Sequence, residues 1–415
     1  MKLLKWFYPG MKIKRWIALA VFGVIMLSMG FVIIISEEQG KASLGTSIII
    51  IIGVIALITG VKRIINSLIT IFLPKSEKDL VDIVYKKRQL EKGPRVIAIG
   101  SGAGLSTVLR GLKEHTSNIT AVVTIVDEGR LSGSVQERFD LPPPMGVREC
   151  LIALADAEPV VGDLFHYRFK KGTELWGYNF GDLFLTAMSE IMGDFDKAVK
   201  ESSRVLAIRG DVVLSTLANV SLIARHQDNT ETIGKENILN STSPIKKVYL
   251  RPQSAKATQE VTNAILRADA IVLCPGALYT ELMPGLLVDG IKEGLLNSKA
   301  IKIYVLNIMT KATETDNYKA SDHLKAINEH LGLNLVNYCI VNKDPITKEQ
   351  TKRYEQEGAS LVSVDKEELG RIGCKVVETP IIDKTSSFIR HDPVKLAGIV
   401  LDLINESRRT KPHAK

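Results

Sequence analysis

The chain has 415 residues, of which 45% are hydrophobic and 24% are charged, and its formal net charge is +8. This length exceeds one average domain, and the composition is that of a folded globular protein with membrane segments. The four cysteines stand without C-x-x-C spacing, at Cys150, Cys274, Cys339 and Cys374. The lack of this spacing argues against a disulfide framework and a zinc site, and it agrees with a reducing cytoplasm.

Much of the positive charge lies near the two ends of the chain. Basic residues flank apolar runs at the N-terminus, and Arg408, Arg409 and Lys411 lie in the tail. Basic clusters beside a membrane segment attract the anionic lipids of the inner leaflet. We therefore expect a lipid bilayer as a partner and no nucleic acid.

Two uncharged apolar runs near the N-terminus predict membrane-spanning helices, over residues 16–36 and 44–61. Only residues 37–43 join them, which indicates a helical hairpin, and we assign residues 1–74 to a membrane anchor. A cleaved signal peptide is the alternative for the first run. That run is too long for the apolar part of a signal peptide, and a second run follows it. Residues 64–73 are expected to lie along the membrane interface.

The flanking charges predict the orientation of this anchor. The connecting loop is net acidic, while basic residues lie outside the two runs, at Lys2, Lys5, Lys12, Lys14, Arg15, Lys62 and Arg63. Because basic residues favour the cytoplasmic side, both termini and the soluble domain are expected in the cytoplasm. The predicted location is the cell membrane, with a multi-pass topology.

Residues 75–94 are predicted to form a charged helical linker, and residues 95–415 a cytoplasmic nucleotide-binding domain. Short apolar runs alternate there with segments of helical periodicity. This alternation predicts a Rossmann-like α/β fold, with a mostly parallel sheet, helices on both faces and ligands above the carboxyl ends of the strands. The expected strands are 96–99, 119–126, 205–208, 220–224, 247–250, 270–273, 301–306 and 336–341, and the expected helices include 184–192, 255–267 and 322–330.

A glycine-rich turn follows the first expected strand and precedes an amphipathic helix. Alternate glycines let the backbone turn tightly and approach a ligand, and a helix N-terminus attracts phosphate. A plain turn is the alternative, because the third glycine comes one position earlier than in G-x-G-x-x-G. The residues predicted to bind ligand here are Gly100, Ser101, Gly102, Gly104 and Leu105.

Acidic and polar residues follow several of the other expected strands. Asp127 and Glu128 come roughly 20 residues after the glycines, where a carboxylate accepts hydrogen bonds from ribose hydroxyls. A second predicted phosphate or sugar turn contains Pro275, Gly276 and Tyr279, although an ordinary tight turn explains it as well. In a third cluster, Asn307 and Thr310 can bind a base or sugar and Lys311 can bind a phosphate. A fourth is Asn342-Lys343-Asp344.

A proline-rich loop delivers Arg148 to the start of a helix. An arginine there can clamp a diphosphate in a bidentate manner, or it can pair with Glu149 or a sheet edge. Near the C-terminus, Asp392 is a candidate N-cap, and His391 alone is weak evidence for acid–base chemistry. No Ser/His/Asp constellation or H-E-x-x-H motif is present, so we assign no catalytic residue.

Together these motifs resemble the YvcK/CofD-like family, and specifically its YvcK (gluconeogenesis factor) branch. The resemblance covers about residues 95–407 through the blocks IAIGSGAGLSTVLRGLK, ITAVVTIVDEG, RECLIALAD, VYLRP, ADAIVLCPGALYTELMPGLLV, NIMTKATETDNYKASDH and RHDPVKLA. It implies a Rossmann-like fold. For the YvcK branch it implies binding of UDP-sugars such as UDP-N-acetylglucosamine, with roles in carbon-source-dependent growth and cell-wall shape. For the CofD branch it implies magnesium-dependent transfer of 2-phospholactate from a guanylyl-activated donor to a deazaflavin.

The chain departs from the family pattern at several positions near the expected site. Ala103 replaces a threonine, Arg130 and Leu131 replace small residues, and Gly146 and Glu149 replace an aspartate and an asparagine. The lost carboxylate at Gly146 weighs against metal-assisted transfer. The membrane hairpin is an addition to the usual soluble chain.

The sequence therefore predicts a membrane-tethered protein that binds a nucleotide sugar and regulates envelope synthesis or central carbon use. Binding of the nucleotide sugar would change the surface that contacts an unidentified regulated protein. The nucleotide sugar itself would not be converted. No cofactor is assigned, and both Mg²⁺ and a homodimer are left open. The alternative is a CofD-like transferase. An NAD-dependent oxidoreductase would need a G-x-G-x-x-G motif, which is missing.

Overall fold

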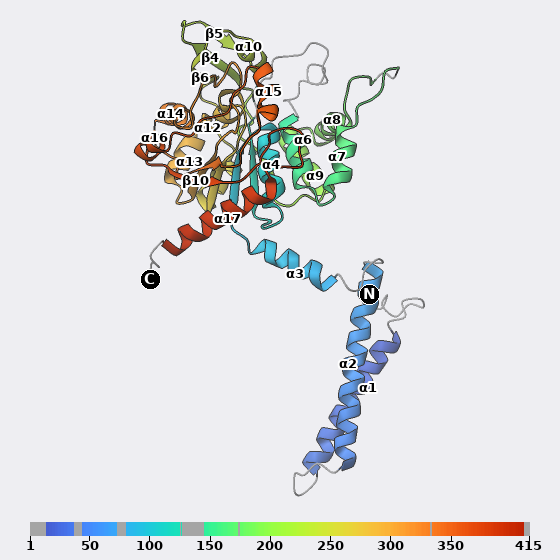
Figure 1. Ribbon diagram of the computed structural model, residues 1–415. Coiled ribbons are helices and arrows are strands. Elements are labelled where there is room, and N and C mark those ends of the chain that lie inside the picture. The colour runs from blue at the N-terminus through green and yellow to red at the C-terminus, as the bar shows by residue number, and fades with distance from the viewer. Residues whose placement is uncertain are drawn as a thin grey trace. The chain divides into compact units, whose positions relative to one another are not determined.

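The computed structural model describes residues 14–36, 44–72, 80–124, 126, 145–172, 175–332 and 334–410. The chain forms two compact units, Met1–Arg88 and Gln89–Lys415. The first contains two long helices, and the second contains an α/β sheet (Figure 1).

Glycines bring the two long helices of the first unit into close contact. Helix α1 spans Lys14–Ser36 and helix α2 spans Leu44–Phe72. A Cβ added at Gly23 would lie 2.6 Å from the backbone N of Leu57, and one added at Gly60 would also meet the facing backbone. Small residues at a helix–helix contact are typical of lipid surroundings, where van der Waals packing holds helices together.

Both helices are long and apolar enough to cross a membrane, the second over Leu44–Ile65. Most of their apolar surface is exposed, including Phe31 and Ile35, whereas a core helix of a soluble domain would bury it. The position of residues 64–72 along the membrane interface stays a prediction. They continue α2 without a break to Phe72.

The second unit is built on a seven-stranded parallel sheet of order β10-β9-β8-β7-β1-β2-β3 (Figure 1). The chain first builds outward from β1 through β2 to β3, and then returns to the other side of β1 with β7. Between β1 and β7 the strand order therefore reverses, which is where doubly wound sheets bind ligands. The strands are β1 Val96–Gly100, β2 Ile119–Val123, β3 Asp211–Leu214, β7 Ala270–Leu273, β8 Ile301–Val305, β9 Tyr338–Asn342 and β10 Lys375–Thr379.

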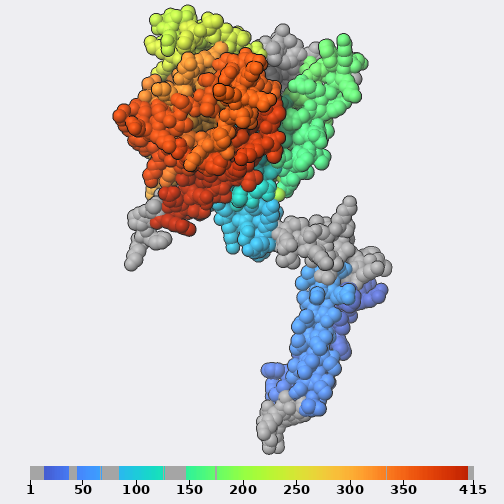
Figure 2. Space-filling view, viewed as in Figure 1, coloured from blue at the N-terminus to red at the C-terminus, as the bar shows by residue number. Residues whose placement is uncertain are grey.

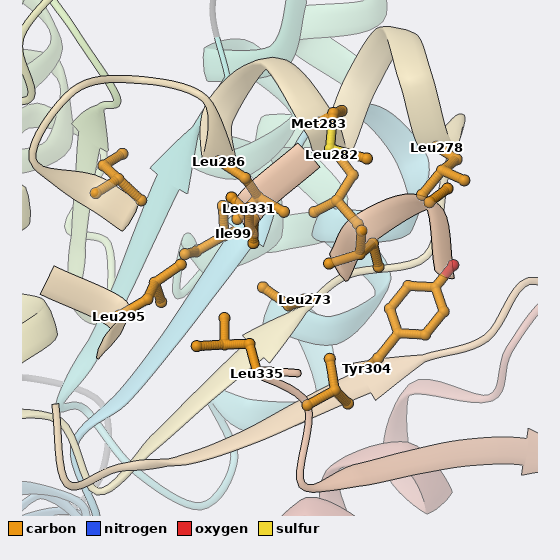
Figure 3. Close-up of a cluster of buried hydrophobic side chains, with 14 of the residues drawn as sticks. Ile99, Leu273, Leu278, Leu282, Met283, Leu286, Leu295, Tyr304, Leu331 and Leu335 are labelled. Atoms are coloured by element: carbon orange, nitrogen blue, oxygen red, sulfur yellow. The ribbon is translucent and has the colours of Figure 1, made fainter. Parts of the chain in front are cut away.

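Helices cover both faces of this sheet because the central strands are apolar on both sides. In β1, Ala98 packs with Leu109 of one apolar cluster, whereas Ile99 packs with Leu286 of another. Figure 3 shows Ile99 and Leu273 directed into the second cluster. The first cluster includes residues from α4 Gly102–Leu112, α6 Met145–Leu154, α8 Phe180–Met192, α9 Phe195–Val205 and α17 Pro393–Thr410. The second includes residues from α11 Gln259–Arg267, α12 Met283–Leu286, α13 Ile291–Asn297, α14 Ala320–Leu331 and α16 Lys366–Arg371.

A three-stranded antiparallel sheet of order β5-β4-β6 lies at one end of the second unit. It consists of β4 Ser221–His226, β5 Glu231–Ile233 and β6 Ile245–Arg251, with α10 Lys235–Leu239 between β5 and β6. Figures 1 and 2 show β4, β5 and α10 as a yellow-green cap. Further helices in the described part of the chain are α3 Leu80–Glu91, α7 Glu158–His166 and α15 Lys348–Gln356. Helix α3 lies inside the predicted linker.

The predicted α/β fold is confirmed, but several predicted strands are wrong in place or partner. Residues 205–208 are not a strand, because α9 continues to Val205 and a turn with Ala207 at φ +49° follows. The runs at 220–224 and 247–250 are strands, but they pair antiparallel in the smaller sheet. Strands β3 and β10 were not predicted. Both are short edge strands, and β10 has exposed charged residues that break an apolar run.

Candidate functional site

The glycine turn lies at the carboxyl end of β1, where the strand order reverses. Gly100 ends β1, and α4 begins at Gly102, which has φ +59°. Ser101 precedes the helix in an extended conformation, and its side chain makes no capping hydrogen bond. The first N–H groups of a helix have no intrahelical acceptor. This helix start therefore has backbone N–H groups without an intrahelical acceptor, the arrangement that the sequence predicted for a phosphate.

Two other predicted residues of this segment have packing roles. A Cβ added at Gly104 would lie 1.6 Å from the carbonyl oxygen of Pro275. The turns after β1 and β7 are thus in direct contact, and Pro275 forms one side of this contact. Leu105 is fully buried in the core. Its side chain anchors α4, so only its backbone is available to a ligand.

Asn307 fixes the turn after β7. Its Oδ1 accepts a hydrogen bond from Gly276 N at 2.8 Å, and its Nδ2 donates to Gly276 O at 2.6 Å. Both polar groups of the Asn307 side chain, a predicted ligand residue, thus bond to the backbone of Gly276, which is another predicted ligand residue. The pair connects the ends of β7 and β8 and holds the turn in one conformation.

Glu281 lies beside the two glycine turns and was missed by the sequence analysis, since its carboxylate oxygens are 3.5 Å from a Cβ added at Gly102 and 2.8 Å from one added at Gly276. It belongs to a π-helical turn, Leu278–Leu282, and π-helical turns are frequent at functional sites. Its Oε2 accepts a hydrogen bond from Ala277 N at 3.1 Å, and Lys235 Nζ lies 3.3 Å from its Oε1. A charged residue inside the apolar run 270–288 was the available signal. Figure 3 shows Leu278 and Leu282 of this turn in the apolar cluster that also contains Ile99 and Leu273.

The buried carboxylate of Glu314 holds the π-helical turn through two hydrogen bonds. Glu314 accepts hydrogen bonds from Tyr279 N at 2.9 Å and from Thr280 Oγ1 at 2.6 Å. Burial raises the pKa of Glu314, and these hydrogen bonds oppose the rise. The phenol of Tyr279 meets that of Tyr318 at 2.8 Å and is nearly fully buried. The side chain of Tyr279, a predicted ligand residue, is therefore part of the core, and burial raises its pKa.

Arg148 lies on α6 and is paired with carboxylates. Its guanidinium meets Asp182 at 2.6 Å and Glu149 at 3.4 Å, which is the alternative that the sequence left open. Its Nε is buried without a partner among the residues described. A Cβ added at nearby Gly146 would lie 2.9 Å from Ser101 Oγ, so the start of α6 approaches the glycine turn closely.

The remaining predicted residues lie farther along the sheet edge or outside the described part of the chain. Thr310 is buried and accepts a hydrogen bond from Ser360 N at 2.8 Å, while Lys311 is exposed. Asp127 and Glu128 fall outside the described residues, so their role stays a prediction.

Two polar groups at the same edge were not predicted as site residues. Thr124, directly after β2, is buried, and its Oγ1 has no partner in the described part of the chain. His391 is buried and donates from Nε2 to Leu306 O at 3.1 Å. Burial lowers the pKa of His391 to about 4. The neighbouring Asp392 caps α17 through Val394 N at 3.0 Å, which confirms the predicted N-cap.

Within the ranges given above, no three His, Cys, Asp or Glu side chains come close enough to share a metal ion. Mg²⁺ is usually held by one or two carboxylates together with substrate phosphates, so this finding concerns only a site built wholly from the described side chains. We derive no chemical step through a metal.

The fold defines a doubly wound, Rossmann-like α/β protein whose strand order reverses between β1 and β7. Residues 96–382 match the family model of 2-phospho-L-lactate transferase CofD. The gluconeogenesis factor of Bacillus subtilis is 41% identical over 313 residues, covering 75% of this chain and 99% of that protein. A Clostridium acetobutylicum relative, provisionally given the same name, is 41% identical over 421 residues, covering 98% of this chain and 93% of that protein. The chain belongs to the CofD/YvcK family.

A solved structure agrees with this assignment. The crystal structure of a UPF0052 family member from Bacillus halodurans is 39% identical, with a TM-score of 0.70, and covers 74% of this chain and 99% of that one. That share is close to the length of the second unit, Gln89–Lys415. The Clostridium relative, in contrast, aligns with nearly the whole chain and therefore also with the N-terminal helices.

Proposed function

We propose that this chain is a membrane-tethered regulatory protein that binds a nucleotide sugar of the UDP-N-acetylglucosamine kind. The observation that carries the proposal is the start of α4, which follows a glycine turn at the reversal of strand order. Such a helix start suits a diphosphate, because its N–H groups and dipole both favour negative charge. In doubly wound folds the ligand lies outside the carboxyl ends of the strands at this reversal, and we place the nucleotide sugar there.

The regulatory part of the proposal is supported by the relatives and by the chemistry of the edge. Relatives carry the name gluconeogenesis factor, which links the family to carbon metabolism. In the described part of the sheet's carboxyl edge, many polar side chains form hydrogen bonds within the protein, and we assign no acid–base pair there. Ligand binding would therefore act by changing the surface offered to a partner protein that controls carbon use and cell-wall or cell-shape synthesis.

The match to the CofD model favours a second candidate, a transferase. Two incubations, one with UDP-N-acetylglucosamine and one with a guanylyl-phospholactate donor and a deazaflavin, each with and without magnesium, separate the two functions. A regulator leaves the nucleotide sugar unchanged. Formation of product from a guanylyl-phospholactate donor and a deazaflavin would instead favour the transferase.

We expect the full-length protein to stay in the membrane pellet after a high-salt or carbonate wash. The reason is the large exposed apolar surface of α1 and α2, which only lipid can cover. Removing residues 1–73 should release a folded soluble fragment, since the Bacillus halodurans structure covers that part alone. Full-length protein in the soluble fraction would contradict a membrane anchor.

Gly102→Val is expected to weaken binding of the nucleotide sugar about 100-fold or more, because a side chain at this position would fill the space of the phosphates. The positive φ of +59° also makes the substitution strained, at a cost of about 1–2 kcal/mol. Asp127→Asn should weaken binding less, by about 1–3 kcal/mol, as one charge-assisted hydrogen bond becomes neutral. Calorimetric titration of both variants measures these effects.

Gly193→Val is the matched control. Gly193 has a similar φ of +70°, and a Cβ there would meet nothing within 4 Å. The Gly193→Val variant carries the same backbone strain at the end of α8, so it should lose stability but keep its affinity for the nucleotide sugar. If Gly102→Val binds like the parent while Asp127→Asn does not, the ligand lies elsewhere and the glycine turn is only a turn.

A further inference from the structure

A cavity of about 280 Å³ lies between the smaller sheet and the helices that cover one face of the main sheet. Its walls come from β6, from the segment that joins α12 to α13 and from the end of α14, and they include residues 247–250, 286–289 and 330–331. None of its lining residues belongs to the turns after β1, β7 and β8. The volume equals that of roughly nine water molecules and is smaller than most pockets for drug-sized ligands, so it suits a small metabolite.

One wall of the cavity is apolar. Leu286 and Leu331 are buried in the second apolar cluster, where Figure 3 shows them. Leu287 packs against the same cluster but is only partly buried, so it adds apolar surface that a ligand can cover. Contact with such a wall favours an aliphatic or aromatic group.

Two lysines approach the end of α14 at this cavity from different elements. The ammonium of Lys292, on α13, lies 3.7 Å from the position of a Cβ on Gly332, where α14 ends. Lys247, on β6, lies beside His330, because the next residue, Val248, donates its N–H to His330 Nε2 at 3.0 Å. Burial lowers the pKa of His330, and the charge of Lys247 lowers it further. The imidazole is therefore a neutral acceptor, and the positive charge here belongs to the two lysines.

No carboxylate neutralises these two ammoniums. Neither Lys247 nor Lys292 forms a salt bridge within the part of the chain that the structure describes. Two acidic residues also line the cavity, but Glu293 accepts a hydrogen bond from Gly290 N at 2.9 Å and caps α13. The other, Asp289, is exposed and pairs with neither lysine. Two cations without a counter-ion repel each other, and an anion between them relieves that cost.

We propose that this cavity binds a small amphipathic carboxylate. The carboxylate lies between the ammoniums of Lys247 and Lys292, and the apolar body lies against Leu287. This second site goes beyond the proposed function and does not depend on it, since a nucleotide sugar is too large for the cavity. A molecule bound here contacts both β6 and α13, so it stabilises one position of the smaller sheet against the helices of the main sheet.

Saturation-transfer NMR of the full-length protein in detergent tests the site with 4-methylpentanoate, its neutral amide and inorganic phosphate. We expect a Kd of about 1 mM for the acid and binding at least about 10-fold weaker for the amide and for phosphate. Lys247→Met and Lys292→Met should each weaken the acid about 3- to 10-fold. Asp289→Asn should strengthen it about 2- to 5-fold, since an anion in the same cavity is neutralised.

Two further variants separate binding in the cavity from uptake into detergent. Gln253 lines the cavity and is exposed, so Gln253→Trp should fill the space without disturbing the core and should abolish binding of 4-methylpentanoate. Lys325→Met is the matched control for lost charge. Lys325 lies on α14 but pairs with Glu368 at 3.0 Å and does not line the cavity, so this variant should bind like the parent.

Several results would overturn the proposal while leaving the proposed function untouched. They are equal binding of the acid by the parent and Gln253→Trp, equal binding of acid and amide, phosphate binding tighter than that of the acid, and no binding of the acid at about 10 mM. Should a lysine variant not fold, Asp289→Asn decides, and weaker or unchanged binding of the acid would reject the site. Conversely, a protein that binds 4-methylpentanoate as expected but not UDP-N-acetylglucosamine would keep this site and lose the proposed function.

Discussion

Gly104→Ala is expected to destabilise the second unit by about 3 kcal/mol or more, at the upper end of the cost of overpacking. A Cβ at this position would lie 1.6 Å from the carbonyl oxygen of Pro275 and 2.6 Å from its carbonyl carbon. Both atoms belong to the backbone of the turn after β7, so no side-chain rotation can relieve the clash. The two turns must move apart, which also loosens the hydrogen bonds of Gly276 with Asn307. Urea denaturation of a fragment of residues 95–415 measures the loss of stability.

Gly398→Ala is the control for this experiment. Gly398 lies inside helix α17, and a Cβ there would meet nothing within 4 Å. Alanine in an open helix position is favoured over glycine by up to about 1 kcal/mol, so this variant should be slightly more stable. If Gly104→Ala unfolds at the same denaturant concentration as the parent, the close contact between the two turns does not exist in solution.

Acidification is expected to cost the second unit about 3 kcal/mol through His391 alone, between pH 7 and pH 4. Burial lowers the pKa of this imidazole from 6.5 to about 4, so the folded chain keeps it neutral where the unfolded chain protonates it. The unfolded state thus binds more protons in this range. The stabilisation from neutral His391 is fully present above pH 6.5 and is lost as the pH falls towards 4. The neutral ring donates to Leu306 O at the end of β8.

His391→Gln isolates this effect, because glutamine keeps a donor for Leu306 O but does not titrate. The difference in unfolding free energy between parent and variant should change by about 3 kcal/mol from pH 7 to pH 4, in favour of the variant at low pH. His115→Gln, at an exposed position, should leave the pH dependence unchanged. A parent and a His391→Gln variant with parallel pH profiles would place the imidazole in contact with water.

The parts of the fold that could be predicted are those with short-range signals. The run 96–99, its glycine turn and the helix that follows all lie within about one βα unit, and periodicity and glycine spacing define them locally. Strands β7 and β8 were found in the same way. The smaller sheet was not, because a strand's apolar pattern does not report whether its partner runs parallel or antiparallel.

The site was predicted less completely, since side-chain partners depend on contacts far apart in the chain. Tyr279 and Arg148 have residue types suited to a ligand, yet Tyr318 and Asp182 engage them inside the protein. Glu281 was missed although it is a charged residue inside an apolar run, because its position depends on a π-helical turn that helical or strand periodicity does not predict. The sequence therefore predicts the edge where a ligand would lie better than it predicts the side chains that face it.

The position of β1 inside the sheet, between β7 and β2, has a consequence for synthesis on the ribosome. Its partner β2 follows within one helix, but its other partner, β7, begins only at Ala270, roughly 170 residues later. At a translation rate of 5–20 residues per second, one edge of β1 waits about 10–30 s for its neighbour. An unpaired strand edge is a template for aggregation during that interval. A chain that terminates before Ala270 would keep this edge open and would lack the turn after β7 that contacts the glycine turn.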